Sequence, residues 1–202
     1  MSSIVPLTAA QPPQRGLKYL LALLVVLVLP PAAFYGWFEV ESRTTVERNA
    51  LDAGHANALK HAGAAATLYS MLRFVCIKDA IAESIVVKLG IANEYIEMHI
   101  KRGRKDTTLE MMRDLHSNMV GISVARWRQS GPISDGRGRS EQLVVLARAG
   151  ILASSAENIG LSTDDAQQAR QIVDLNRAIL WFEQNKPVIE LQVNNALRSG
   201  LH

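Results

Sequence analysis

The chain has 202 residues, a formal net charge of +3, and a composition that is 48% hydrophobic but only 5% aromatic. This length fits one ordinary domain with its own hydrophobic core beside a short N-terminal segment. The small net charge, with basic residues spread among acidic ones, predicts no nucleic-acid partner. A single cysteine, Cys76, excludes an intramolecular disulfide, and its apolar neighbours predict a small buried side chain.

An uncharged stretch of twenty residues, 19–38, follows the first basic residues of the chain. An α-helix of this length crosses the hydrocarbon core of a bilayer, which is about 30 Å thick. A cleaved signal peptide is the alternative, but Pro31 occupies a position where cleavage after Ala33 needs a small residue. Aromatic residues at both ends are typical of a retained span. The predicted anchor residues are Tyr19, Leu20, Leu24, Leu27, Pro30, Pro31, Phe34, Trp37 and Phe38.

Two Lys or Arg residues precede the predicted anchor, and two follow it closely, so the count of basic residues is a tie. The first pair lies nearer to the apolar run. We therefore expect residues 1–18 to form a short cytoplasmic tail. Residues 39–202 are expected to form a periplasmic domain of a single-pass protein in the bacterial inner membrane. Pro30 and Pro31 remove two backbone donors inside the span, which predicts a bend there.

No proline interrupts the chain from Glu39 to Arg102, which predicts helix over about residues 40–102. An unbroken helix of that length would extend about 90 Å, so we expect at least one break, near Gly63 or Gly90. The first half is rich in alanine and suits close packing against another helix. In the second half, apolar residues at spacings of three and four predict one buried face. These residues are Ile85, Leu89, Ala92, Ile96 and Ile100.

Capping patterns mark the start of later helices. Thr107 with Glu110 predicts a helix over 107–129, Ser140 predicts one over 140–154, and Ser162 with Asp165 predicts one over 162–198. The apolar register continues across Pro187, which favours a kinked helix, or two coaxial helices, over a strand there. No series of strands and turns appears. The predicted fold class is all-α, an antiparallel bundle of about four helices after one transmembrane helix.

No catalytic signature is present, because the chain lacks a G-x-S-x-G nucleophile motif and a phosphate-binding loop. Five histidines raise the question of a metal, but His55 and His61 point to different sides of a helix. We expect these histidines to be solvated or singly hydrogen-bonded. The sequence therefore predicts no catalytic residue, no cofactor and no metal ligand. The five histidines are His55, His61, His99, His116 and His202.

Apolar and aromatic residues give the candidate contact sites. Small and large apolar residues at helical spacing predict helix–helix interfaces. Trp127 lies between two arginines beside a glycine-rich loop, which makes this tripeptide a candidate partner contact, although core packing is the favoured interpretation of Trp127 itself. The interface candidates are Ala58, Ala62, Ala65, Leu72, Ile179 and Phe182, and the partner-contact candidates are Arg126, Trp127 and Arg128.

The layout of the chain combines a short tail, "LTAAQPPQRGLKY", with one span and a small external domain. In this architecture it resembles the minor bitopic subunits of bacterial conjugation and type IV secretion machines. The resemblance implies partners in a multi-subunit assembly and a role in transfer, but it matches no motif residue by residue. We therefore expect a non-catalytic envelope component that acts through helix–helix contacts with other subunits or with a second copy. The alternatives are a helical ligand-sensing module and a membrane-anchored enzyme without a recognisable motif.

Overall fold

The computed structural model describes residues 31–52, 54–100, 107–130, 138–153 and 155–199. All regular elements of these residues are helical, so the predicted all-α class and helical bundle are confirmed for this part of the chain. One compact unit runs from Trp37 to His202, close to the expected domain 39–202. The helices are α2 (Pro31–Arg48), α3 (Gly54–Phe74), α4 (Asp79–Ile100), α5 (Thr108–Ser130), α6 (Arg139–Arg148), the 3₁₀-helix η1 (Glu157–Ile159), α7 (Thr163–Gln171) and α8 (Leu175–Ser199).

Most of the predicted membrane anchor lies outside the described residues. Within the described part of the chain, no helix is both long enough and apolar enough to cross a bilayer. Pro31 is the first residue of α2, a position where its missing N–H removes no helical hydrogen bond. Phe34 and Trp37 also belong to α2. The anchor candidates outside the described residues are Tyr19, Leu20, Leu24, Leu27 and Pro30.

Phe38, the last anchor candidate, is buried in the helical domain. Its side chain is only 5% exposed, and a Cβ built at Gly63 of α3 would lie 3.2 Å from the Phe38 ring. The glycine therefore leaves room for the aromatic ring to lie against the α3 backbone. This contact packs the Phe38 side chain of α2 against α3.

The helical segment 40–102 is interrupted, as expected, because it forms parts of α2, α3 and α4, but the expected positions of the break are wrong. The breaks lie at residues 49–53 and 75–78, whereas Gly63 and Gly90 lie inside helices. Each break begins with a left-handed residue, Ala50 with φ 52° and Cys76 with φ 64°. Backbone bonds from Leu51 to Val46 and from Ile77 to Leu72 close these helix ends in the Schellman pattern. Cys76 is consequently exposed in a turn, which corrects the prediction of a buried side chain.

The capping prediction for α5 is confirmed. The backbone N–H of Thr107 donates to Glu110 Oε2 at 2.8 Å, and the N–H of Glu110 donates to Thr107 Oγ1 at 3.3 Å. For α6 the prediction is wrong at both ends. Gly138 takes the N-cap position, with its N–H donating to Glu141 at 2.8 Å, and the helix ends at Arg148 because Gly150 turns the chain with φ 69°.

The expected helix over 162–198 is divided into α7 and α8. Ser162 caps α7 as predicted, accepting a hydrogen bond from the Asp165 N–H at 3.2 Å. The break at residues 172–174 is held by Thr108, whose backbone N–H donates to the Ile172 carbonyl at 2.9 Å and whose Oγ1 accepts from the Asp174 N–H at 2.9 Å. Helix α8 continues through Pro187, which confirms the choice of helix over strand.

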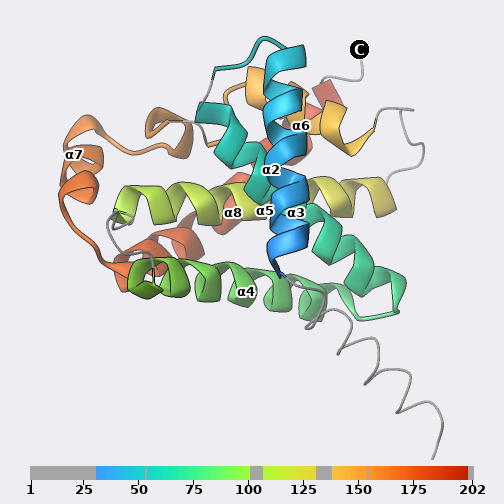
Figure 1. Cartoon of the computed structure of the whole chain (residues 1–202), viewed down its shortest axis with the longest axis horizontal. Helices are drawn as coiled ribbons and strands as arrows, with labels where there is room; N and C mark the ends of the chain where they lie inside the picture. The colour runs from blue at the N-terminus through green and yellow to red at the C-terminus, as the bar shows by residue number, and fades with distance from the viewer. Residues whose placement is uncertain (1–30, 53, 101–106, 131–137, 154, 200–202) are drawn as a thin grey trace, which may run out of the picture. The chain divides into compact units, whose positions relative to one another are not determined.

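Helix α5 lies at the centre of the domain, where it packs against α3, α4 and α8. Figure 1 shows α4 running beside it along one edge of the domain. Helices α3 and α5 approach each other closely, because a Cβ at Gly121 would lie only 2.0 Å from the Ala62 carbonyl oxygen. Only glycine permits this contact between the two backbones.

Replacing Gly121 with Ala tests this contact. A new Cβ must push α3 and α5 apart, and overpacking of this kind lowers the free energy of unfolding by about 1–3 kcal/mol. Chemical denaturation of the full chain measures the change. Gly138→Ala is the control, because a Cβ there meets nothing within 4 Å and replaces only an N-cap glycine. Equal stability of Gly121→Ala and wild type would contradict the contact.

Candidate functional site

The outward side of α4 carries an apolar stripe, flanked by the exposed polar residues Ser84 and Lys88. Ile81, Ile85, Leu89, Ala92 and Ile96, spaced by three or four residues, form what we call the α4 outer face. Ile81 is 51% exposed, Leu89 43% and Ile96 50%, whereas the opposite side buries Ala82, Val86 and Val87. Four of the five residues predicted to form the buried face of this helix, Ile85, Leu89, Ala92 and Ile96, belong to the α4 outer face. The prediction that this face is buried is therefore wrong.

Helix α8 also exposes large apolar residues, but they do not form a comparable stripe. Leu180, Val188 and Leu191 are exposed on its outward side. Gln184 and Asn195 lie on the same side and are exposed as well. The α4 outer face is thus the more continuous apolar surface of the two helices.

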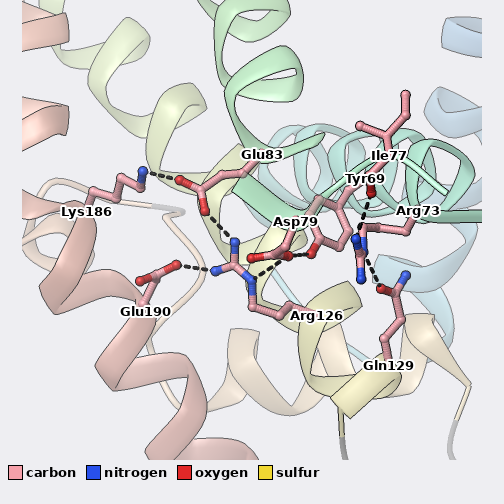
Figure 2. Close-up of polar contacts among 9 residues, drawn as sticks. All are labelled: Tyr69, Arg73, Ile77, Asp79, Glu83, Arg126, Gln129, Lys186 and Glu190. Carbon is pink, nitrogen blue, oxygen red and sulfur yellow. Dashed lines mark hydrogen bonds and ion pairs between the residues drawn. The ribbon is translucent and has the colours of Figure 1, made fainter. Parts of the chain in front are cut away.

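Arg126 of α5 joins α4 to α8 through three carboxylates. Figure 2 shows its guanidinium between Glu83, Glu190 and Asp79. The Nε atom of Arg126 lies 3.2 Å from Asp79 Oδ1. Lys186 of α8 pairs with Glu83 as well, and the arrangement is a network of partly buried ion pairs.

Hydrogen bonds favour the ionised forms of the two α4 carboxylates in this network. Burial opposes ionisation of Glu83, but hydrogen bonds from Lys186 and Arg126 outweigh it and lower the pKa of Glu83 below 4.5. Burial opposes ionisation of Asp79 too, and hydrogen bonds from Tyr69 and Arg126 lower its pKa. Burial and the bond to Asp79 raise the pKa of Tyr69. The carboxylates are therefore ionised and the phenol is neutral, which fits a structural network better than an acid–base catalyst.

The three predicted partner-contact residues have different environments. Arg126 is held in the network just described. Trp127 is partly buried against the core, and the guanidinium of Arg198 lies 5.8 Å from its ring centroid. Arg128 is exposed. The tripeptide therefore does not form one surface patch.

Most of the predicted interface residues lie inside the domain. Their side chains fill the core between the helices, so α3 makes its close helix contact with α5 of the same chain. Ile179 is partly exposed on α8. The buried residues of this set are Ala58, Ala62, Ala65, Leu72 and Phe182.

A second polar cluster joins α3, α4 and α5. His61, Glu94 and Asp114 each offer one ligand atom, and these atoms all lie within 4.8 Å of one another. All three residues are buried, with 6%, 1% and 8% of their surfaces exposed. His61 Nε2 lies 3.4 Å from Asp114 Oδ2, and Asn57 Nδ2 donates to Asp114 Oδ1 at 2.8 Å. Burial raises the pKa of Asp114, although His61 opposes the rise.

Sequence spacing did not identify this cluster, because its members come from three helices. His116 is not solvated, because it is 1% exposed, and its Nδ1 has no hydrogen-bond partner among the described residues. Burial lowers the pKa of His116 to about 4. His55 is buried beside Asp52, and His99 is exposed; His202 lies outside the described residues.

Comparison of the chain with protein-family models, with curated proteins and with solved structures finds no match. Functional inference therefore depends on three features of the described residues. These are the α4 outer face, the ion-pair network around Arg126, and the cluster of His61, Glu94 and Asp114.

Replacing Arg126 with Gln tests the structural role of the network. The change removes the cation that pairs with Asp79 and Glu83 of α4 and with Glu190 of α8. We expect the free energy of unfolding to fall by about 1–3 kcal/mol, less than for a fully buried pair because the network is partly exposed. Denaturant titration at pH 7 measures the loss. Arg43→Gln breaks the exposed Arg43–Glu39 pair and is the control, with a loss below about 0.5 kcal/mol. Equal losses in the two variants would contradict a special role for Arg126.

The network also predicts sensitivity to acid. Since the pKa values of Asp79 and Glu83 are lowered in the folded chain, their stabilisation is complete above their ordinary values of 3.8 and 4.5. It is lost as the pH falls through the lower folded values. Thermal unfolding between pH 2 and 5 should therefore show a smaller acid-dependent loss of Tm in Arg126→Gln than in wild type, on the order of a few degrees.

His116 predicts a separate loss of stability as the pH falls from 6.5 toward 4. Its folded pKa of about 4 lies below the ordinary 6.5, so the unfolded chain binds the proton first. Stability is complete above pH 6.5 and should fall by on the order of 3 kcal/mol as the pH drops toward 4. His116→Leu removes the titrating group, so its stability should change less over this interval. Identical pH slopes in the variant and wild type would contradict the assignment.

Proposed function

We propose that the chain is a non-catalytic, single-pass component of a bacterial inner-membrane assembly, with its helical domain in the periplasm. It binds other subunits through helix–helix contacts, and the α4 outer face is the surface that makes them. The single observation that carries this proposal is the exposure of Ile81, Leu89 and Ile96 on one side of a helix. Conjugation or type IV secretion is the kind of assembly that the layout of the chain suggests.

The energetics favour covering this face. Because Ile81, Leu89 and Ile96 are large and exposed, covering the α4 outer face would remove a row of apolar side chains from water. Removing one Leu or Ile side chain from water contributes about 1.5–3 kcal/mol, and the α4 outer face presents several such side chains. The fifteen-residue interval from Ile81 to Ile96 extends about 22 Å, enough for several turns of a partner helix to pack along it.

The membrane location is supported by the uncharged stretch at residues 19–38. An anchor next to the domain would hold it at high local concentration beside other membrane subunits. Weak contacts along α4 would then be sufficient for assembly. No enzymatic role is proposed, because the ion-pair network around Arg126 consists of carboxylates that are already paired with cations.

The double variant Leu89→Glu with Ile96→Glu tests the proposal. Two carboxylates on the α4 outer face must be desolvated when a partner helix binds, so association should fall at least tenfold. The full chain is purified in mild detergent, its mass is measured by light scattering, and the proteins that copurify are identified. Two differently tagged copies expressed together show whether one partner is a second copy of the chain.

Leu180→Glu is the matched control, because Leu180 is also an exposed leucine but lies on α8. It should keep the wild-type mass and partners. Both variants should keep the wild-type helix content and a Tm within a few degrees, since their substitutions are on the surface. A wild-type chain that is a lone monomer, or a double variant that keeps every partner, would overturn the proposal.

A further inference from the structure

We propose that His61, Glu94 and Asp114 form a binding site for one divalent transition-metal ion, which links α3, α4 and α5. The site is independent of the proposed binding of other subunits. One imidazole and two carboxylates are ligands that Zn²⁺ accepts, and sites with three protein ligands and a fourth open position are common for this ion. Mn²⁺ also accepts carboxylate oxygens.

The geometry of the cluster is close to what such an ion needs. Two ligand atoms at about 2.1 Å from Zn²⁺ in a tetrahedral site lie about 3.4 Å apart. His61 Nε2 and Asp114 Oδ2 are 3.4 Å apart already. The ligand atom of Glu94 lies within 4.8 Å of both, so binding requires it to move toward the other two ligand atoms.

A hydrogen bond outside the cluster orients one ligand. Asn57 Nδ2 holds Asp114 Oδ1 at 2.8 Å, and the other carboxylate oxygen, Oδ2, is the one that faces His61. A hydrogen bond to a ligand from a residue that does not itself bind the ion fixes the orientation of that ligand in metal sites. Asn57 and His61 lie one turn apart on α3, so a single helix supplies both a ligand and the group that positions another ligand.

Burial supplies a further reason to infer an ion. Glu94 and Asp114 lie within 4.8 Å of one another and away from water, where two carboxylates repel each other. Glu97 adds negative charge near Asp114, and His61, Arg113 and Lys60 offset part of it. A divalent cation between Glu94 and Asp114 converts this repulsion into attraction and draws the three helices together. The alternative occupant is a proton, which would leave a metal-free cluster of hydrogen bonds.

The test uses the full chain, purified in mild detergent without a polyhistidine tag and stripped with a chelator. Zn²⁺ and Mn²⁺ are added separately, and metal content after dialysis is measured by mass spectrometry. We expect one ion per chain of at least one metal. Tm should rise by about 5–10 °C when the free ion is at a hundredfold excess over its Kd.

The variants Glu94→Gln and Asp114→Asn keep side-chain size but remove the charge. The Kd for the ion should rise by more than about tenfold in each. His99→Ala removes an exposed histidine of α4 outside the cluster and should keep the wild-type affinity. A second measurement needs no variant. The visible absorption of the wild-type chain loaded with Co²⁺ reports nitrogen and oxygen ligands directly, so the proposal can be tested even if a variant fails to fold.

Three results would overturn the proposal. Wild-type chain that keeps neither ion above the level of a buffer control shows that the cluster is a proton-sharing network. Equal affinity in wild type and the folded Glu94→Gln and Asp114→Asn variants places the ion elsewhere. Loss of binding in His99→Ala does the same. None of these results depends on whether the α4 outer face binds a partner.

Discussion

The backbone contact between Ala62 of α3 and Gly121 of α5 is the constraint on which the domain depends. Because Gly121 has no side chain, the two helices approach until a Cβ would lie 2.0 Å from a carbonyl oxygen. His61 is adjacent to Ala62, and Asp114 lies two turns before Gly121 on the same helix. The close crossing therefore brings the imidazole and the carboxylate within 3.4 Å. Helices α4 and α8 then pack on α5 and complete the core.

Local chemistry made some of the helix boundaries predictable from the sequence. The caps formed by Thr107 with Glu110 and by Ser162 with Asp165 were predicted because such side chains satisfy free N–H groups at helix starts. The breaks after α2 and α3 gave no such signal, since Ala50 and Cys76 hold left-handed conformations that usually belong to glycine. Gly150 does carry the usual signal for the end of α6, because glycine adopts the left-handed conformation without strain.

Tertiary packing made the candidate site harder to predict than the fold class. Periodicity correctly identified an apolar face on α4, but it does not say whether that face meets the core or the solvent. The opposite face is apolar too, with Ala82, Val86 and Val87 buried. The three members of the polar cluster lie on separate helices, so no spacing along the chain relates them. The one available signal was Glu94, an acidic residue seven positions after Val87 and therefore on the same side of the helix.

Hydrophobicity alone does not fix the rotation of α4, because both of its sides carry large apolar residues. We infer that the charged residues of its inner side fix it. Glu83 must meet Arg126 and Lys186, and Glu94 must lie beside His61 and Asp114. Turning α4 by half a turn would bury Lys88 and leave Arg126 and Lys186 without Glu83, at a cost of several kcal/mol. The inner carboxylates thereby keep Ile81, Leu89 and Ile96 facing outward, where a partner can reach them. Polar groups that add little net stability can in this way decide which apolar surface a helix presents.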